Sequence, residues 1–517
     1  MGLRRYLWEH RIALAIILFA LILRLIFLPY AKFENETVRD LTIANQMLDD
    51  GTLRLKGLSS EIDENSPQQA FGPLFYYLLA FSQVIWRHPY SAVALIAFLV
   101  AASGFLLYAT LRRYFGLSAA LVALSLFLFN PWVFFFVSLN FANTSFLIPL
   151  LILYFFSLCR IFFDHKDSYL TLTGISLASM LQFHLSSLLL LPVTFILLLM
   201  MRPSIFRSRF FYFTIGISAI FFVPYLLYTV QHDAFHQTFS FIFADRYSAT
   251  RFENFRDSIS ISFMLATTYL GPYLLGTTNI FPGVIPIIIF LFDLLTSFVL
   301  GISLLWMLFW CIKRKPLSPH RRMFFLLLVL FLLPVILAII PGKNVSPHYL
   351  FITYPSQFII LALFFDRFPL RRFLKISFLS LLLAVYFMTL FAFYGSLVNL
   401  GGTDGIYGIP LKSKINVLET VHQRTPEGYI LFYDYVKPEY AYLQPHYAAH
   451  LTLLPHTSYE EGMEGYLLLD FYSRGNFAEK SMTSQERLFY QELPADAVGR
   501  LRLVPLQRYG TALAAAR

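Results

Sequence analysis

The sequence predicts an all-α polytopic membrane protein with about 11 transmembrane helices, and three observations favour this fold class. Hydrophobic residues make up 57% of the 517 residues and charged residues only 14%, unlike the composition of typical soluble domains. Many apolar runs reach the roughly 18 residues that a membrane-crossing helix needs. Basic residues cluster in short loops between these runs, as they do in the cytoplasmic loops of membrane proteins.

The basic clusters indicate the topology. All of them fall on one side if the chain has about 11 spans and a cytoplasmic N-terminus. The predicted spans cover residues 12–30, 90–111, 117–138, 144–163, 168–185, 186–201, 210–230, 283–312, 323–340, 349–365 and 376–397. The clusters are Arg4/Arg5/Arg11, Arg112/Arg113, Arg160/Lys166, Arg202/Arg207/Arg209, Lys313/Arg314/Lys315/Arg321/Arg322 and Arg367/Arg371/Arg372/Lys375. Counting the run 71–86 as a span would break this agreement, so we expect a juxtamembrane helix there, at the outer interface.

These spans define a transmembrane domain over residues 1–400, with a first outer loop at 31–89. Beyond residue 400 the chain has ordinary polar content, and we expect a small external α/β domain over 401–517. The first span has a basic start, but no small-x-small cleavage site follows it, so we expect it to remain uncleaved. The predicted location is the bacterial inner (plasma) membrane, with the C-terminal domain extracytoplasmic.

Several classes of protein are disfavoured by missing motifs. The sequence has no G-x-x-x-x-G-K-[ST] loop for ATP, no H-E-x-x-H or Cys/His zinc spacing, and no D-x-D in the first loop,. Cys159 and Cys311 both fall on the predicted cytoplasmic side, so we expect no disulfide and no metal cluster. No cofactor is indicated; a divalent cation is possible, although no motif indicates one. The net charge of +10 lies in loops suited to anionic lipid, and no nucleic-acid-binding module is visible.

The first outer loop carries the most informative group of residues. The stretch FENETVRDLTIANQML begins at Phe33, just beyond the first span, where carboxylates near hydrocarbon are expensive. In a helix beginning near Glu36, Glu36 and Asp40 share a face and Arg39 lies adjacent to it. A carboxylate here could take the proton from an acceptor hydroxyl or amine as a glycosidic bond forms. The alternative is a solvated loop whose acids, including Glu34, only keep it at the interface.

Two segments of this loop resemble a known family. The sequence reads E-T-V-R-D-L-T-I-A-N-Q-M-L from Glu36 to Leu48 and G-P-L-F-Y-Y-L from Gly72 to Leu78. This pattern resembles the first outer loop of the GT-C glycosyltransferases, in the bacterial branch with the protein O-mannosyltransferases and the lipid A aminoarabinose transferase. In this alignment the family's catalytic Asp falls on Glu36. The resemblance therefore implies that Glu36, or alternatively Asp40, is the general base, with Arg39 beside the substrate.

Two further segments resemble the same superfamily. Asn140 and Asn143, which follow Asn130-Pro131, resemble its second outer loop, although the acid expected there is absent. Gln182 and His184 in LQFHLS resemble the L-Q-x-H-x-[ST] segment of the bacterial relatives. A lone His in an apolar run is also commonly a core residue, so both interpretations remain open.

Phosphate binding would need fixed positive charge on the same outer side. Lys343, His348 and Tyr349 in GKNVSPHYL resemble the late outer loop of the family, which carries cationic and polar groups toward the lipid phosphate. Arg246 and Arg251 lie in the polar stretch that begins at residue 231. Each is commonly an interfacial anchor, and together with Lys343 they form a candidate phosphate-binding wall.

The resemblance implies an inverting membrane glycosyltransferase with a first-loop carboxylate as base. Its partners would be a polyprenyl-phosphate-linked monosaccharide, membrane lipid, and an extracytoplasmic acceptor that is a glycan, a lipid or a protein. One alternative is a flippase or transporter of lipid-linked sugars, but it would need mid-span charges and internal repetition, of which the sequence offers little beyond Asp293. A second alternative is a lipid-linked glycan polymerase or ligase, which shares outer-loop chemistry.

Overall fold

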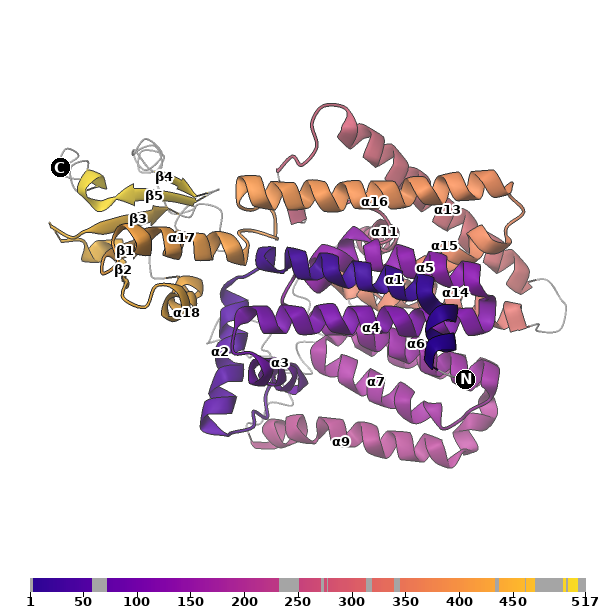
Figure 1. Ribbon diagram of the computed structural model, residues 1–517. Coiled ribbons are helices and arrows are strands. Elements are labelled where there is room, and N and C mark those ends of the chain that lie inside the picture. The colour runs from indigo at the N-terminus through magenta and orange to yellow at the C-terminus, as the bar shows by residue number, and fades with distance from the viewer. Residues whose placement is uncertain are drawn as a thin grey trace.

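The computed structural model shows a long bundle of helices with a small β-sheet at one end (Figure 1). It describes residues 3–57, 72–231, 251–270, 274–276, 278–312, 319–338, 345–432, 437–460, 462–469, 496–498 and 501–509. The helices of the first half are α1 (Leu3–Phe27), η1 (Leu28–Tyr30), α2 (Asn35–Asp50), α3 (Leu74–Ile85), α4 (Pro89–Phe115), α5 (Leu117–Phe129), η2 (Trp132–Ser138), η3 (Asn143–Phe146), α6 (Leu147–Asp164), α7 (Tyr169–Phe183), η4 (Leu185–Leu189), α8 (Leu190–Met201), η5 (Pro203–Arg207) and α9 (Arg209–Gln231). Those that follow are α11 (Arg251–Met264), α13 (Ile285–Ile312), α14 (Pro319–Leu337), η6 (Pro347–Thr353), α15 (Ser356–Arg367), α16 (Arg372–Leu400), α17 (Leu411–Arg424), α18 (Pro438–Tyr447) and η7 (His456–Ser458).

Within the described residues, six helices are long and apolar enough to cross a membrane, or up to eight if each of two bent pairs forms one span. The bent pairs are α5 with η2, at 53°, and η6 with α15, at 51°. The remaining predicted spans coincide with α7, with the pair η4 and α8, and with α14. A helical membrane fold is therefore confirmed, while the count of about 11 spans stays a prediction. The run 71–86 forms the short helix α3, as expected for a juxtamembrane element.

The bend after α5 has a local cause in the Asn130-Pro131 pair. Pro131 lacks a backbone N–H and cannot continue the helical hydrogen-bond ladder. The Oδ1 atom of Asn130 accepts a hydrogen bond from Val133 N at 3.2 Å, and its Nδ2 atom lies 3.3 Å from the carbonyl oxygens of Leu265 and Thr267. Asn130 is fully buried, so the Asn130-Pro131 pair has a structural role and fixes the bend inside the bundle.

Two charged residues inside the predicted spans are used for packing. Arg24 of α1 is buried and donates to Ser138 Oγ and to the carbonyl of Leu128, both at 2.8 Å. Asp293 of α13 accepts hydrogen bonds from Thr268 N at 2.9 Å and from Thr268 Oγ1 at 2.8 Å. Because both side chains bind neighbouring segments of the same chain, they stabilise the bundle, and Asp293 gives no support to the transporter hypothesis.

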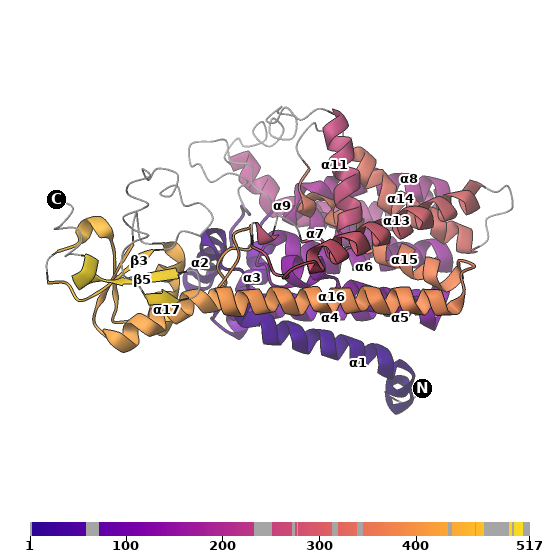
Figure 2. The ribbon, with the colours of Figure 1, turned by 90° about the horizontal axis from the view of Figure 1, so that it is seen from above.

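The two ends of the bundle differ in charge and in architecture. Basic residues meet at the end where α1 begins: Arg112 lies 2.9 Å from His10, and Arg113 forms an ion pair with Asp164 at 3.1 Å. The sheet and α2 lie at the opposite end, as both ribbon views show (Figures 1 and 2). This arrangement fits the predicted topology, in which the N-terminus and the C-terminal domain lie on opposite sides. Which side is cytoplasmic remains a prediction.

The segment after α16 forms an α/β unit. Its strands are β1 (Tyr429–Phe432), β2 (Thr452–Pro455), β3 (Gly465–Leu469), β4 (Asp496–Val498) and β5 (Leu501–Pro505), in the order β2-β1-β3-β5-β4. Strand β1 pairs parallel with β2 and β3, whereas β5 pairs antiparallel with β3 and β4. Helix α17 packs beside this sheet (Figure 1). The segment thus combines a small sheet with helices, and the external α/β domain over 401–517 stays a prediction.

Candidate active site

The candidate site begins with the short connector 31–34 between η1 and α2. Glu34 is the N-cap residue of α2, with an extended backbone (φ −129°, ψ 174°), and its N–H lies 3.5 Å from Thr37 Oγ1. Helix α2 then continues to Asp50 and ends at Gly51, whose φ of +63° is favourable for glycine,. Because this segment is helical, Glu36 and Asp40 lie one turn apart, as the sequence predicted.

Asp40 is enclosed by polar partners from α2 and α3. Its Oδ1 atom accepts hydrogen bonds from Arg39 Nε at 2.9 Å and from the Tyr76 hydroxyl at 3.2 Å. The side chain of Asp40 is only 6% exposed, whereas that of Arg39 is 37% exposed. Asp40 is therefore committed to contacts within the protein, while part of the Arg39 guanidinium faces the surroundings.

Burial raises the pKa of Asp40 to about 6,. The ion pair with Arg39 and the hydrogen bonds from Arg39 and Tyr76 oppose this rise, and the negative charge of Glu36 adds to it. Glu36 is close enough to influence Asp40, yet it is exposed and forms no hydrogen bond or ion pair with any residue that the structure describes. Of the two carboxylates, Glu36 is the one accessible to a substrate.

Gln182 joins the predicted LQFH segment to the G-P-L segment. Its Oε1 atom accepts a hydrogen bond from Leu74 N at 3.3 Å, at the start of α3, and its Nε2 atom donates to the Phe221 carbonyl of α9 at 2.8 Å. Both ends of this buried amide are therefore occupied by the protein. The structure gives Gln182 a structural role, and its contact with substrate stays a prediction.

His184 lies in the turn between α7 and η4 and meets residues of η6. Its ring centroid is 5.3 Å from that of His348 and 5.4 Å from that of Tyr349. The Nδ1 atom accepts from Ser186 N at 3.2 Å and lies 2.8 Å from Ser186 Oγ. Three residues predicted from two separate segments are thus brought together, and we call His184, His348 and Tyr349 the aromatic cluster.

The other predicted residues divide into two groups. Asn140 pairs with Lys32 in an isolated parallel β-bridge, and Asn143 Nδ2 donates to the Phe183 carbonyl at the end of α7. Arg246 and Lys343 lie outside the described residues, and so does the side chain of Arg251, although its backbone begins α11. The candidate phosphate wall therefore stays a prediction.

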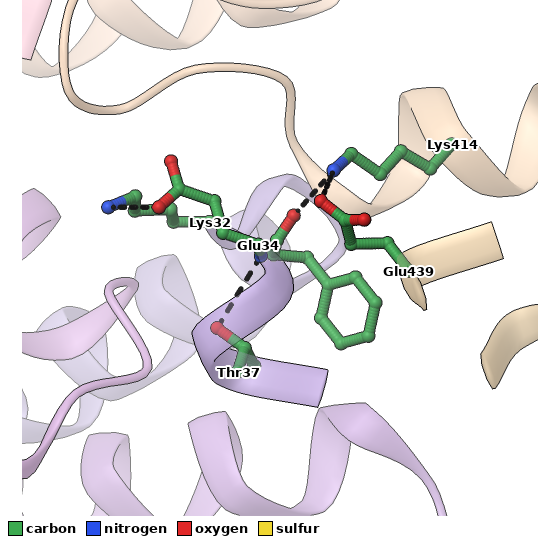
Figure 3. Close-up of polar contacts among 6 residues, drawn as sticks. Lys32, Glu34, Thr37, Lys414 and Glu439 are labelled. Atoms are coloured by element: carbon green, nitrogen blue, oxygen red, sulfur yellow. Dashed lines mark hydrogen bonds and ion pairs between the residues drawn. The ribbon is translucent and has the colours of Figure 1, made fainter. Parts of the chain in front are cut away.

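Sequence reasoning missed a group of charges next to Glu34 (Figure 3). Lys32 Nζ lies 2.9 Å from Glu34 Oε2, and the buried Lys414 of α17 lies 3.1 Å from Glu439 Oε1 of α18. One signal could have identified Lys414. It occupies the face of α17 that also carries the buried Leu411 and Leu418, and a lysine is rarely fully buried unless it is paired.

Comparison with known proteins finds one partial family match and several similar folds. Residues 68–228 match the model of the family described as dolichyl-phosphate-mannose-protein mannosyltransferase. The fold is similar to that of ArnT from Cupriavidus metallidurans bound to undecaprenyl phosphate, with a TM-score of 0.54, 12% identity, and coverage of 96% of this chain and 98% of ArnT. ArnT in the apo state gives a TM-score of 0.52 at 12% identity, with coverage of 95% and 97%. The chain therefore has an ArnT-like fold, and its residues 68–228 resemble the mannosyltransferase family. No curated protein sequence matches it.

The family match does not extend to the acids of the first outer loop. The matched segment 68–228 contains α3, Gln182 and His184, but it begins after Glu36 and so does not include it. The assignment of a catalytic role to the first-loop acids therefore depends on their geometry. That geometry places one accessible carboxylate, one buried carboxylate and one partly exposed guanidinium within two turns of a helix.

Proposed function

We propose that this protein is a GT-C glycosyltransferase that moves a monosaccharide from a polyprenyl-phosphate carrier to an extracytoplasmic acceptor. The observation that carries the proposal is the accessible Glu36 beside the Arg39–Asp40 pair, at the end of the bundle that also holds the α/β unit. The similar fold of ArnT, which was crystallised with undecaprenyl phosphate, supports a lipid-linked phosphate as the leaving group. The acceptor class, whether glycan, lipid or protein, is left open by this geometry.

Glu36 is the proposed general base. Its carboxylate takes the proton of the acceptor hydroxyl or amine while the acceptor atom forms a bond to the anomeric carbon. The bond from that carbon to the phosphate oxygen breaks, and the polyprenyl phosphate leaves with the electron pair. A single displacement of this kind inverts the configuration at the anomeric carbon. Asp40 holds the Arg39 side chain and contributes charge rather than proton transfer.

The leaving phosphate needs positive charge, because no proton donor is assigned to it. Arg39 uses its Nε atom for Asp40 and keeps a partly exposed guanidinium, which can bind a phosphate in two-pronged geometry. Arg246, Arg251 and Lys343 complete the proposed wall, and the aromatic cluster is proposed to line the donor side. Fixed charges and positioning then supply most of the rate enhancement.

The central experiment incubates the purified protein with labelled polyprenyl-phosphate sugars and an extracytoplasmic acceptor fraction. Release of polyprenyl phosphate together with labelled acceptor is expected. Glu36→Gln should reduce the rate at least about a thousandfold while the protein stays folded. Full activity of Glu36→Gln with an inactive Asp40→Asn would move the base to Asp40, and activity in both variants would refute a first-loop base.

The same system separates the alternatives. Movement of the labelled lipid across a vesicle membrane without bond cleavage would identify a flippase, and growth of a lipid-linked chain would identify a polymerase or ligase. Arg246→Ala and Lys343→Ala should each weaken donor binding, read as a higher KM for the lipid-linked sugar. Unchanged donor affinity in both variants would remove these residues from the site.

A further inference from the structure

The connector before α2 is held by two segments that lie far from it in sequence. The carbonyl of Ala31 accepts from Leu411 N at 2.9 Å, and Lys32 N donates to the Leu139 carbonyl at 2.9 Å. The carbonyl of Phe33 accepts a hydrogen bond from Lys414 Nζ at 2.8 Å. Three consecutive residues are therefore fixed by main-chain or side-chain contacts, and two of the three contacts come from residues 411–414. Figure 3 shows Lys414 reaching from α17 toward the start of α2.

Lys414 is unusual among these contacts because its charge is buried. The side chain is 1% exposed, and that of Glu439, which lies 3.1 Å from its ammonium group, is 7% exposed. A buried ammonium is costly unless it is paired and hydrogen-bonded. The pair with Glu439 satisfies the charge and the second contact goes to a backbone carbonyl two residues before Asn35, the first residue of α2. A charged donor makes this the strongest type of hydrogen bond available to that carbonyl.

The turn before α17 adds to the same anchorage. The Tyr407 hydroxyl donates to the Tyr30 carbonyl at 2.6 Å. Gly408 has a φ of +66°, and a Cβ atom on it would lie 3.3 Å from Glu34 Oε1. The chain after α16 thus lines the connector on one side, from Tyr30 to Glu34.

We propose that Lys414 is a positioning residue for the first-loop carboxylate. It fixes the connector so that the first turn of α2 presents Glu36 in one place relative to the bound donor. The α/β unit then completes the active site through α17 and α18, in addition to any contact of its own with the acceptor. This inference rests on the proposed function, because it assigns Lys414 to the same reaction.

The expected consequence is a change in turnover rather than in donor binding. Displacement of a catalytic group by about 1 Å can cost on the order of a hundredfold in rate. A connector without its Lys414 contact lets the first turn of α2 move, so Glu36 spends less time in the reactive position. Donor binding should be largely retained, because the proposed phosphate and sugar contacts also come from other loops. A lower kcat with an unchanged KM is the signature of such a loss.

The test compares two variants with a matched control. Lys414→Met replaces the lysine with an unbranched apolar side chain, but it leaves Glu439 without its ion-pair partner. The double variant Lys414→Met/Glu439→Gln therefore removes both charges together. Both should lower kcat at least about tenfold with donor KM within about twofold. Tyr442→Phe is the control, because it removes the 3.1 Å contact from Asn45 Nδ2 to the Tyr442 hydroxyl, which also links α18 to α2, and keeps the ring that contacts Phe33 of the connector. Its kcat should stay within about twofold of the wild type.

A second measurement needs no substrate. Amide hydrogen exchange over residues 31–40 should be faster in the double variant than in wild type or Tyr442→Phe. A folded double variant with wild-type kcat and wild-type exchange would overturn the proposal, and so would a rise in KM without a fall in kcat. If the wild-type protein transfers no sugar, the proposed function fails, and the exchange result still decides whether Lys414 orders the connector.

Discussion

The side chain of Gln182 occupies the space beside the α-carbon of Gly72. A Cβ atom on Gly72 would lie 2.3 Å from Gln182 Oε1 and 2.5 Å from its Cγ. The same Oε1 atom accepts the hydrogen bond from Leu74 N, so the close approach and the bond form one contact. Two segments that resemble the GT-C family, 110 residues apart in sequence, are therefore a single packing unit between α3 and α7.

Gly72→Ala should destabilise the protein by about 1–3 kcal/mol. The new methyl group forces Gln182 away and breaks its contact with Leu74. Thermal unfolding in detergent measures the effect. Gln182→Ala makes room for the methyl group, so the double variant should lose less stability than the sum of the single variants. Gly216→Ala is the control, because nothing lies within 4 Å of its Cβ position; a similar loss there would contradict this explanation.

A second prediction concerns Asn130, whose side-chain amide donates hydrogen bonds to backbone carbonyl groups. Its Nδ2 atom lies 3.3 Å from the oxygens of Leu265 and Thr267. Asn130→Ala should cost about 1–3 kcal/mol, because the Thr267 carbonyl and the Val133 N–H lose this partner,. The Leu265 carbonyl keeps the Tyr354 hydroxyl at 2.8 Å. Asn130→Asp should cost more, although its shape is nearly the same, because a buried carboxylate would face two carbonyl oxygens. The order of the two unfolding midpoints checks this, and an Asp variant as stable as the Ala variant would contradict the hydrogen-bond assignment.

The helices were predictable because the bilayer imposes a simple rule. A segment that crosses hydrocarbon must satisfy its backbone hydrogen bonds internally and be apolar over about 20 residues. Each predicted run accordingly coincides with a helix, α7 and the pair η4–α8 included. The bends were not predictable from hydropathy alone. They depend on local chemistry at Asn130-Pro131 and at Tyr354-Pro355, the pair between η6 and α15,.

Only those features of the candidate site that involve residues close together in sequence were predictable. The placement of Glu36 and Asp40 one turn apart follows from helical geometry, which the sequence states directly. The burial of Asp40 against Tyr76 and the reach of Lys414 to the Phe33 carbonyl depend on contacts across 36 and 381 residues. No local pattern encodes such distances. The exposure that favours Glu36 over Asp40 therefore required the structure.

Asp40 predicts a specific pH dependence of stability. Its pKa is raised from 3.8 to about 6, so the folded state binds the proton more tightly than the unfolded state does. Protonation of Asp40 therefore stabilises the folded state below about pH 4, and this stabilisation is lost as the pH rises through 6. Asp40→Asn should therefore be more stable than wild type at pH 8, by up to about 3 kcal/mol, and nearly equal at pH 4. Unfolding midpoints across this range measure the difference; a difference independent of pH would contradict the assignment.

His88 predicts the opposite dependence, at the contact between α4 and α18. Its pKa is lowered from 6.5 to about 4, first by burial and then by the nearby His446, and its Nε2 atom lies 2.7 Å from the Tyr447 hydroxyl. The unfolded state therefore binds the proton first, and stability should fall as the pH drops from 6.5 to 4. His88→Gln keeps a polar side chain without a titrating ring, so it should remove this loss and raise the unfolding midpoint relative to wild type at pH 5 but not at pH 8. Tyr447→Phe is the control, because it removes the contact at every pH and should lower stability without changing its pH dependence. A His88→Gln variant with the same unfolding midpoint as wild type at pH 5 would show that protonation of His88 does not affect stability.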